Sequence, residues 1–211
     1  KVVLNSNNSP SIDAVIMALD WLAVNAPKGS IVNISIGFTH LSGTNSDPMC
    51  SVPIYYAPWE SAVRNAHNAG IIVVVAAGND TCNTANFTPT NIPESFVVGA
   101  TDNTLISSGK DAKASFSRTG FNISTFNPGV SVLLINQNGT PVLANGTSFS
   151  APYIAGVFAI ACQAAGQACN TATTAASLYQ ALRNEGTLNT VTNTNGTPLT
   201  GATSRFIPQK W

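Results

Sequence analysis

Residues 145–156 read Asn-Gly-Thr-Ser-Phe-Ser-Ala-Pro-Tyr-Ile-Ala-Gly and place a serine where a nucleophile would be stabilised. A turn at Gly146 and Thr147 precedes an apolar run, which predicts a helix over 148–163 that is buried on nearly all sides. Pro152 is expected in the first turn of this helix, where its missing N–H costs no hydrogen bond. Ser148 would then lie at the helix N-terminus, where free N–H groups and the helix dipole stabilise an alkoxide or oxyanion. The alternative is that Gly-Thr-Ser only caps the helix, since serine and threonine are common caps.

A second segment, residues 71–80, is a continuous β-branched run that ends in Ala-Ala-Gly-Asn-Asp. Such a run predicts a central parallel strand covered on both faces. Residues 31–36 predict another strand, and Ser35–Gly37 lie at its end. Because parallel sheets bind ligands at the carboxyl ends of their strands, the two strand ends are expected to form a site together. Taken alone, Asn79 would be interpreted as a turn residue after glycine.

These segments resemble the subtilisin-like serine proteases, most closely the proteinase K branch. The family's nucleophile signature is Gly-Thr-Ser, any residue, small, any, Pro, any two, small, small, and residues 146–156 satisfy all of it. Ala-Ala-Gly-Asn at 76–79 and Val-Asn-Ile-Ser-Ile-Gly at 32–37 are similar to the family's oxyanion and substrate-binding strands. Shorter similar blocks lie at 96–102, 115–117 and 127–130, and the likeness fades beyond about residue 184.

The resemblance implies a secreted serine endopeptidase that acts on peptides or proteins. Ser148 would be the nucleophile, and the side-chain amide of Asn79 would donate to the oxyanion. The substrate backbone would pair with the first strand end, and a primary pocket would lie between the two strand ends. Its expected walls are Ser35, Ile36 and Gly37 on one side and Ala76, Ala77 and Gly78 on the other. This pocket would accept large aromatic or long aliphatic side chains, with Asp80 adding tolerance for Lys or Arg and Phe38 at the rim.

The catalytic base is missing from the sequence pattern. A serine protease needs Ser, His and Asp together, and the family's Asp-Thr-Gly and His-Gly-Thr-His segments do not occur here. The two histidines are His40, in a polar loop near the first strand end, and His67, expected on the solvent side of a helix. Neither is expected to act as the base.

We therefore interpret the chain as the C-terminal, nucleophile-bearing portion of one peptidase domain. Its first residues, 1–5, read as an apolar strand without a lead-in, which suggests a cut end, so Asp and His would reside on a partner N-terminal fragment. The alternative is a catalytically inactive relative that acts as a binding or structural module. An α/β-hydrolase esterase fits poorly, because Ser150 occupies the second glycine position of Gly-X-Ser-X-Gly.

Strands alternate with helices along the chain, which predicts an α/β fold. The expected order is strand 1–5, helix 11–25, strand 31–36, helix 57–69, strand 71–77, strands near 95–100, 121–126, 130–135 and 141–144, and helices 148–163 and 172–184. This pattern predicts a parallel sheet with helices on both faces. The resemblance implies that this is a subtilisin-like three-layer sandwich that is incomplete at its N-terminal side. Residues 186–204 are expected to form a surface loop or loose hairpin.

Composition limits the partners. The 211 residues suit one domain or most of one, and charged residues make up 9%, against about 25% in ordinary domains. Nine positive and nine negative residues cancel, so no nucleic-acid partner or acidic membrane surface is expected. No apolar run approaches the length of about 20 residues needed to span a bilayer.

Four cysteines allow two disulfides in three pairings. Cys162 and Cys169 are close enough in sequence for local closure. Cys50 and Cys82 each follow one of the two neighbouring strands, which favours their pairing at the same sheet edge. No metal-ligand spacing is present.

The resemblance also bears on calcium. In the proteinase K branch, carbonyls at positions corresponding to Pro93 and Ser95 bind Ca²⁺ together with an aspartate, and Ser124 replaces that aspartate here. Without this carboxylate no calcium site is expected there, although Asp102 and Asp111 could form a weak one.

Overall fold

The computed structural model describes residues 11–38, 48–107, 110–166, 172–185, 187–188, 190–199 and 205–206. In these segments the helices are α1 (Ile12–Asn25), α2 (Ala57–Asn68), α3 (Thr147–Ala165) and α4 (Ala172–Glu185), with single 3-10 turns at Pro48–Ser51 and Thr84–Asn86. The strands are β1 (Ile31–Ile34), β2 (Ile72–Ala76), β3 (Phe96–Ser107), β4 (Lys110–Lys113), β5 (Ile123–Pro128), β6 (Val132–Ile135), β7 (Pro141–Ala144), β8 (Thr187–Leu188), β9 (Val191–Thr192) and β10 (Arg205–Phe206).

The main sheet has the strand order β1-β2-β3-β5-β10-β8, and β4 and β9 extend it beside β3. β1, β2, β3 and β5 are parallel to their neighbours in this order. β4 runs antiparallel to β3, and β6 and β7 form a separate hairpin. The predicted α/β class is confirmed, with a sheet that is mainly parallel.

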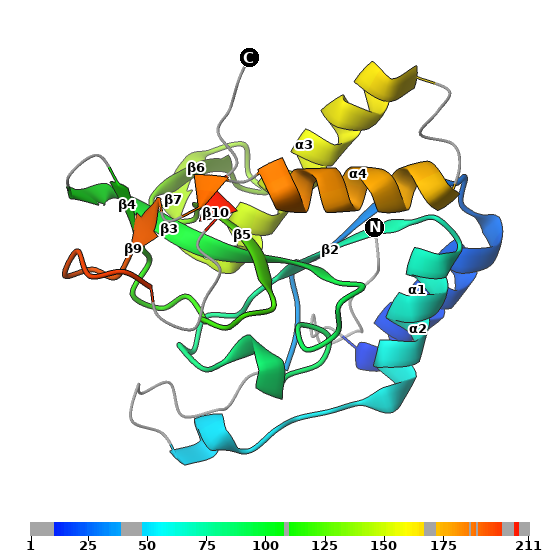
Figure 1. The fold of residues 1–211 in the computed structure, drawn as a ribbon, viewed down its shortest axis with the longest axis horizontal. Helices are drawn as coiled ribbons and strands as arrows, with labels where there is room; N and C mark the ends of the chain where they lie inside the picture. The colour runs from blue at the N-terminus through cyan, green and yellow to red at the C-terminus, as the bar shows by residue number, and fades with distance from the viewer. Residues whose placement is uncertain are drawn as a thin grey trace.

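The residues of β2 show why the fold has three layers. Successive side chains of a strand point to opposite faces. Ile72 and Val74 pack with residues of α3 and α4, whereas Val73 and Val75 pack with residues of α1 and α2. Helices therefore cover both faces of the sheet, as Figure 1 shows for α1 and α2 on one side and α3 and α4 on the other.

Some strands differ from the prediction. β3 continues beyond the predicted end at residue 100 to Ser107, and its second half pairs antiparallel with β4. β1 ends at Ile34, two residues early. Of the surface loop or loose hairpin predicted for residues 186–204, the hairpin is seen in the antiparallel bridge between Thr192 and Pro198. Val191 does not lie on the surface, because it is buried and pairs with Asp111 of β4. The predicted strand at 1–5 lies outside the described residues.

Helix α3 is less buried than predicted. Ala151, Ile154 and Phe158 are buried against the sheet, but Gly156 and Ile160 on the opposite face are exposed. The length of 19 residues and the apolar composition would suffice to cross a bilayer, contrary to our expectation, although core helices of globular proteins share these properties. Its packing on β1, β2 and β3 makes α3 a core helix with one uncovered apolar face.

Lys113, the last residue of β4, is a buried cation that binds backbone carbonyls. Its Nζ donates to the carbonyl oxygens of Ala114 at 2.8 Å and Ser117 at 2.9 Å, and a third acceptor, Ser115, lies at 3.4 Å. Burial lowers the pKa of Lys113 to about 8, so the ammonium remains mostly charged at neutral pH. It fixes the loop between β4 and β5.

Replacing Lys113 with methionine should destabilise the protein. The Lys113→Met side chain fills similar space but leaves the carbonyl of Ser117 without its buried donor, which costs about 1–3 kcal/mol in the free energy of unfolding. Denaturant titration measures this change. Lys110→Met, an exposed lysine of the same strand, is the control and should stay within about 0.5 kcal/mol of the parent. Equal effects of the two substitutions would contradict the assignment.

Candidate active site

Ser148 is the second residue of α3, and the preceding turn fixes its position. Gly146 is the N-cap with φ of 152°, a conformation that residues with side chains rarely adopt, and a Cβ there would lie 3.4 Å from Nδ2 of Asn79. The N–H of Gly146 donates to the carbonyl of Gly129 at 2.8 Å. Within the described chain, no hydrogen bond uses the N–H of Ser148. That N–H is therefore a free donor at the positive end of the helix dipole.

Asn79 follows β2 and is held by the first residue of α3. Thr147 donates both its backbone N–H and its Oγ1–H to Oδ1 of Asn79, each at 2.9 Å. The N–H of Gly78 in turn donates to Oγ1 of Thr147 at 3.1 Å. Because Oδ1 is occupied, the orientation of the amide is fixed and Nδ2 is left as a donor beside Gly146. Two donors thus lie at the start of one helix, an arrangement that can stabilise an oxyanion.

Pro152 lies inside α3 and removes one helical hydrogen bond, which Ser35 at the end of β1 replaces. It is the sixth residue of α3, not in the first turn as predicted, and it has no N–H for the carbonyl of Ser148 four residues earlier. The hydroxyl of Ser35 donates to that carbonyl at 3.1 Å. The hydroxyl of Ser148 lies 3.4 Å from the carbonyl oxygen of Ser35. The end of β1 therefore replaces the helical bond that proline removes.

Ser148 opens into a pocket of about 210 Å³. A cavity of about 150 Å³ is enough to hold a benzene ring, so this pocket can hold a large side chain. Its walls are residues 35–38, 76–79 and 88–90, together with Arg118, Thr147 and Ser148. All the residues that we predicted as walls line it, and the structure brings them together with Ser148 and Asn79. Their roles in binding and catalysis remain predictions.

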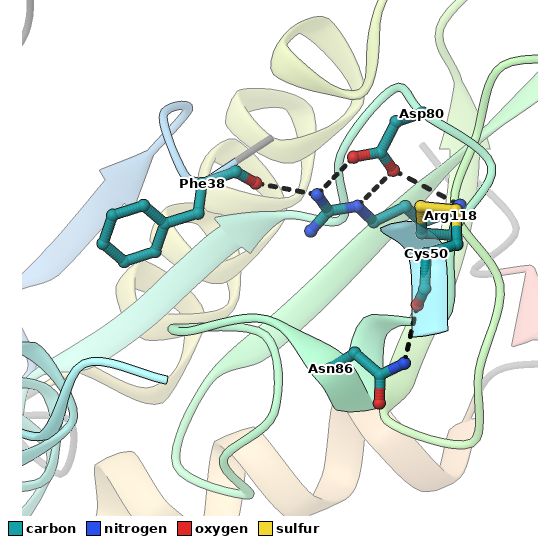
Figure 2. Close-up of a disulfide and its surroundings, with 6 residues drawn as sticks. Phe38, Cys50, Asp80, Asn86 and Arg118 are labelled. Atoms are coloured by element: carbon teal, nitrogen blue, oxygen red, sulfur yellow. Dashed lines mark hydrogen bonds and ion pairs between the residues drawn. A yellow bond between two sulfur atoms is a disulfide. The ribbon is translucent and has the colours of Figure 1, made fainter. Parts of the chain in front are cut away.

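The pocket contains a charged residue that sequence reasoning missed. Arg118 binds Asp80 with two hydrogen bonds of 2.5 Å, from Nε and Nη2. Nη2 also donates to the carbonyl of Phe38 at 2.7 Å, as Figure 2 shows. Asp80 and Arg118 are 38 residues apart, and no local pattern connects them. The guanidinium links the loops that follow β1 and β2.

This pairing changes the role predicted for Asp80. Burial by itself raises the pKa of Asp80, but the hydrogen bonds and charge of Arg118, with the backbone N–H of Cys82, hold the pKa below its ordinary value. The carboxylate is therefore committed to Arg118 and is not a free anion for a cationic substrate. The ring of Phe38 contacts Trp59, with ring centroids 5.6 Å apart, so it packs toward the core as well as lining the pocket.

A disulfide fixes the loop after Asn79. Cys50 and Cys82 are bonded, as predicted, and the N–H of Cys82 donates to Oδ1 of Asp80 at 3.3 Å (Figure 2). Asn86 binds the carbonyl of Cys50 through its side-chain amide at 2.9 Å. The predicted pairing of Cys162 with Cys169 involves a residue outside the described part of the chain.

The histidines do not supply a base within the described residues. His40 lies outside them. His67, on α2, is half-buried and its ring packs edge-on against Tyr179 with centroids 5.5 Å apart, so our solvent-side expectation is wrong. Burial lowers the pKa of His67, against an opposing effect of Glu94. His67 is not among the residues that line the pocket.

The residues expected to bind calcium in relatives have other partners here. The hydroxyl of Ser124 accepts the N–H of Val97 at 3.2 Å, and Ser124 is buried. The carbonyl of Pro93 accepts the hydroxyl of Tyr179 at 2.7 Å. The described residues contain no group of three His, Cys, Asp or Glu that could hold a metal ion. Ser124 and Pro93 therefore form hydrogen bonds within the chain, and the absence of calcium from this position stays a prediction.

Comparisons with known proteins show the family to which the chain belongs. The profile of the Subtilase family matches residues 1–199, so the chain belongs to the subtilase family. It is 34% identical over 185 residues to the extracellular serine proteinase of Thermus sp. (strain Rt41A), covering 86% of this chain and 40% of that protein. It is 30% identical over 162 residues to proteinase R of Parengyodontium album, covering 74% of this chain and 36% of that protein. A cold-adapted subtilisin-like serine proteinase superposes with a TM-score of 0.73 at 26% identity, covering 99% of this chain and 66% of that chain.

The Asp80–Arg118 pair predicts how stability depends on pH. The pKa of Asp80 is lower in the folded protein than its unfolded value of about 3.9, so the pair stabilises above about pH 4, and this contribution is lost as pH falls through the folded pKa. The parent should be more stable than Asp80→Asn near pH 6, and the difference should shrink as the pH is lowered toward about 2. Denaturant titration across this range measures it. Asp20→Asn, an exposed carboxylate on α1, should not alter the acid limb, and a parent–variant difference that stays constant with pH would refute the prediction.

Proposed function

We propose that this chain is the nucleophile-bearing portion of a secreted serine endopeptidase, in which Ser148 acts within a Ser-His-Asp triad. The observation that carries this proposal is the pair of hydrogen bonds from Thr147 to Oδ1 of Asn79. These bonds leave the Asn79 amide hydrogens and the Ser148 N–H as donors at the helix start that carries the Ser148 hydroxyl. The subtilase membership of the chain supports the same chemistry.

The histidine and aspartate are proposed to come from a segment carrying Asp-Thr-Gly and His-Gly-Thr-His, on the N-terminal part of the same protease. Two observations support a missing partner. The chain spans 40% of the Thermus proteinase, and no histidine among the described residues lines the pocket. The exposed apolar face of α3, with Gly156 and Ile160, and the outer edge of β1 are surfaces that such a segment would cover.

In the proposed mechanism the substrate binds as an extended strand along residues 35–37. A Cβ on Gly37 would meet no atom within 4 Å, so a peptide backbone has room to approach. The histidine removes the proton of Ser148, whose oxygen attacks the peptide carbonyl. The negative charge that develops on the carbonyl oxygen is stabilised by the Ser148 N–H and by Nδ2 of Asn79. The amine product leaves with a proton from the histidine, and water then hydrolyses the acyl-enzyme.

Secretion is part of the proposal. A Thermus relative is named an extracellular serine proteinase, and the Cys50–Cys82 disulfide suits an oxidising compartment.

The alternative, an inactive subtilisin-like scaffold, is favoured by the lack of a histidine in the pocket among the described residues. A fluorophosphonate probe separates the two proposals, because it reacts with an activated serine. We expect Ser148 to be labelled in the full-length protein and not in isolated residues 1–211. No labelling of the full-length protein would favour the scaffold. Rapid labelling of residues 1–211 alone would show that the base lies within them, and His40 would be the first residue to replace.

Replacing Ser148 and replacing Asn79 should impair catalysis to different extents. Ser148→Ala should abolish peptide hydrolysis by the full-length protease. Asn79→Leu should lower kcat about 10²- to 10³-fold with little change in KM, the magnitude known for the corresponding donor in subtilisin itself. Steady-state kinetics on a peptide substrate measures both. Asn138→Leu, at an exposed turn, is the control, and an unchanged kcat in Asn79→Leu would exclude its proposed role.

We also propose that the calcium site of the proteinase K branch is absent from this protein. The contacts of Ser124 and Pro93 described above support this. EDTA should therefore leave the melting temperature of the full-length protein unchanged within about one degree, since no site-bound Ca²⁺ is removed. Restoring the carboxylate with Ser124→Asp provides the matched comparison. A loss of many degrees in the parent on chelation, reversed by added Ca²⁺, would overturn the proposal.

A further inference from the structure

Arg118 lines the same pocket as Ser148, but its partner Asp80 does not. The guanidinium of Arg118 therefore faces the pocket, while the carboxylate of Asp80 lies outside the pocket lining. Arg118 is nearly inaccessible, with 2% of its side chain exposed, so only its pocket-facing edge is available to what enters the pocket. This arrangement is the reverse of an acidic pocket for Lys or Arg.

The guanidinium is held rigidly. Asp80 binds its Nε and Nη2, and the carbonyl of Phe38 binds Nη2 as well. The Phe87 ring centroid lies 3.7 Å from Cζ. Gly78 makes room for it, because a Cβ there would lie 2.7 Å from Cζ. A donor fixed from several directions loses little conformational entropy when it binds a ligand.

One nitrogen of this guanidinium remains for a ligand. None of the hydrogen bonds among the described residues uses Nη1 of Arg118, and Figure 2 shows it on the side turned away from Asp80. Nη1 is also not among the fully buried polar atoms that lack a partner in the described residues, so it keeps some accessible surface although the side chain as a whole is buried. The pocket that Arg118 lines together with Ser148 provides the open space at this surface.

We infer that Arg118 determines the substrate preference of the primary pocket, by donating from Nη1 to an oxygen at the end of a long, uncharged P1 side chain such as glutamine. This inference rests on the proposed endopeptidase function. Asp80 cancels the net charge of the guanidinium, so the pocket offers a strong donor without requiring an anionic substrate. A P1 lysine would bring a second cation against Arg118 and is disfavoured.

The test uses the full-length protease and three peptides that differ at P1, which is Gln, Met or Lys. Met matches the length of Gln without its oxygen. The double variant Asp80→Asn/Arg118→Met removes the ion pair without leaving one buried charge unpaired, which is the costly case. Arg64→Met, an arginine of α2 that does not line the pocket, is the control. Thermal melts establish that each variant is folded.

In the parent, kcat/KM should be about tenfold higher for Gln than for Met, the lower range for a hydrogen bond to a charged group, and lowest for Lys. The double variant should reduce the Gln-to-Met ratio to about two or less and raise the relative rate for Lys, while Arg64→Met keeps the parent ratios. Unchanged ratios in a folded double variant would overturn the inference.

A binding measurement separates this inference from the catalytic proposal. Calorimetry on the Ser148→Ala protein gives Kd for the uncleaved Gln and Met peptides, and we expect the same order of preference. If the parent cleaves no peptide but the Kd preference exists and depends on Arg118, the catalytic proposal fails and the inference stands. If the peptides are cleaved and bound without preference, the inference alone fails.

Discussion

The site depends on one contact, the two hydrogen bonds by which Thr147 reaches Oδ1 of Asn79. The first N–H groups of a helix have no helical partner and normally bind an N-cap side chain. The N-cap of α3 is Gly146, which has no side chain, so Asn79 satisfies the N–H of Thr147 from the end of β2. The amide that caps the helix is thereby oriented for donation, so a helix-capping requirement and an oxyanion-binding requirement are met by one residue.

The parallel sheet makes this contact possible. Ile34 of β1 pairs with Val75 of β2, so both strands end at one level and their next residues form facing walls. Side chains of β2 are buried on both faces, which fixes the level at which Asn79 leaves the sheet. Pro152 strengthens the link, because the carbonyl that it leaves without a helical donor binds the hydroxyl of Ser35 at the other wall. Sheet register and helix start therefore determine the pocket together.

Much of this was predictable because it is encoded locally. The β-branched run of β2 and the periodicity of α1 and α2 predicted their elements closely, and the order of strands predicted the Cys50–Cys82 bond. Features that depend on distant partners were missed or wrong. The burial of α3 was overestimated, since an apolar sequence does not reveal which face lacks a neighbour. The pairing of the short strands β8 and β9 with the main sheet was not predicted, because their pairing with β10 and β4 is specified by the sheet and not by their own residues.

Arg118 is another feature that could not be predicted from the sequence, because its partner is distant in the chain. The resemblance implied a pocket for large apolar side chains in which Asp80 adds tolerance for Lys or Arg, whereas the fold brings Arg118 onto that carboxylate. Two buried charges are costly to desolvate, and a pair that only stabilised the fold could often be replaced by apolar residues without loss. The pair at this position also joins the backbone after β1 to the loop after β2 and presents its positive side to the pocket. The desolvation cost of the Asp80–Arg118 pair is better explained by the effect of the pair on the shape and polarity of the pocket than by stability alone.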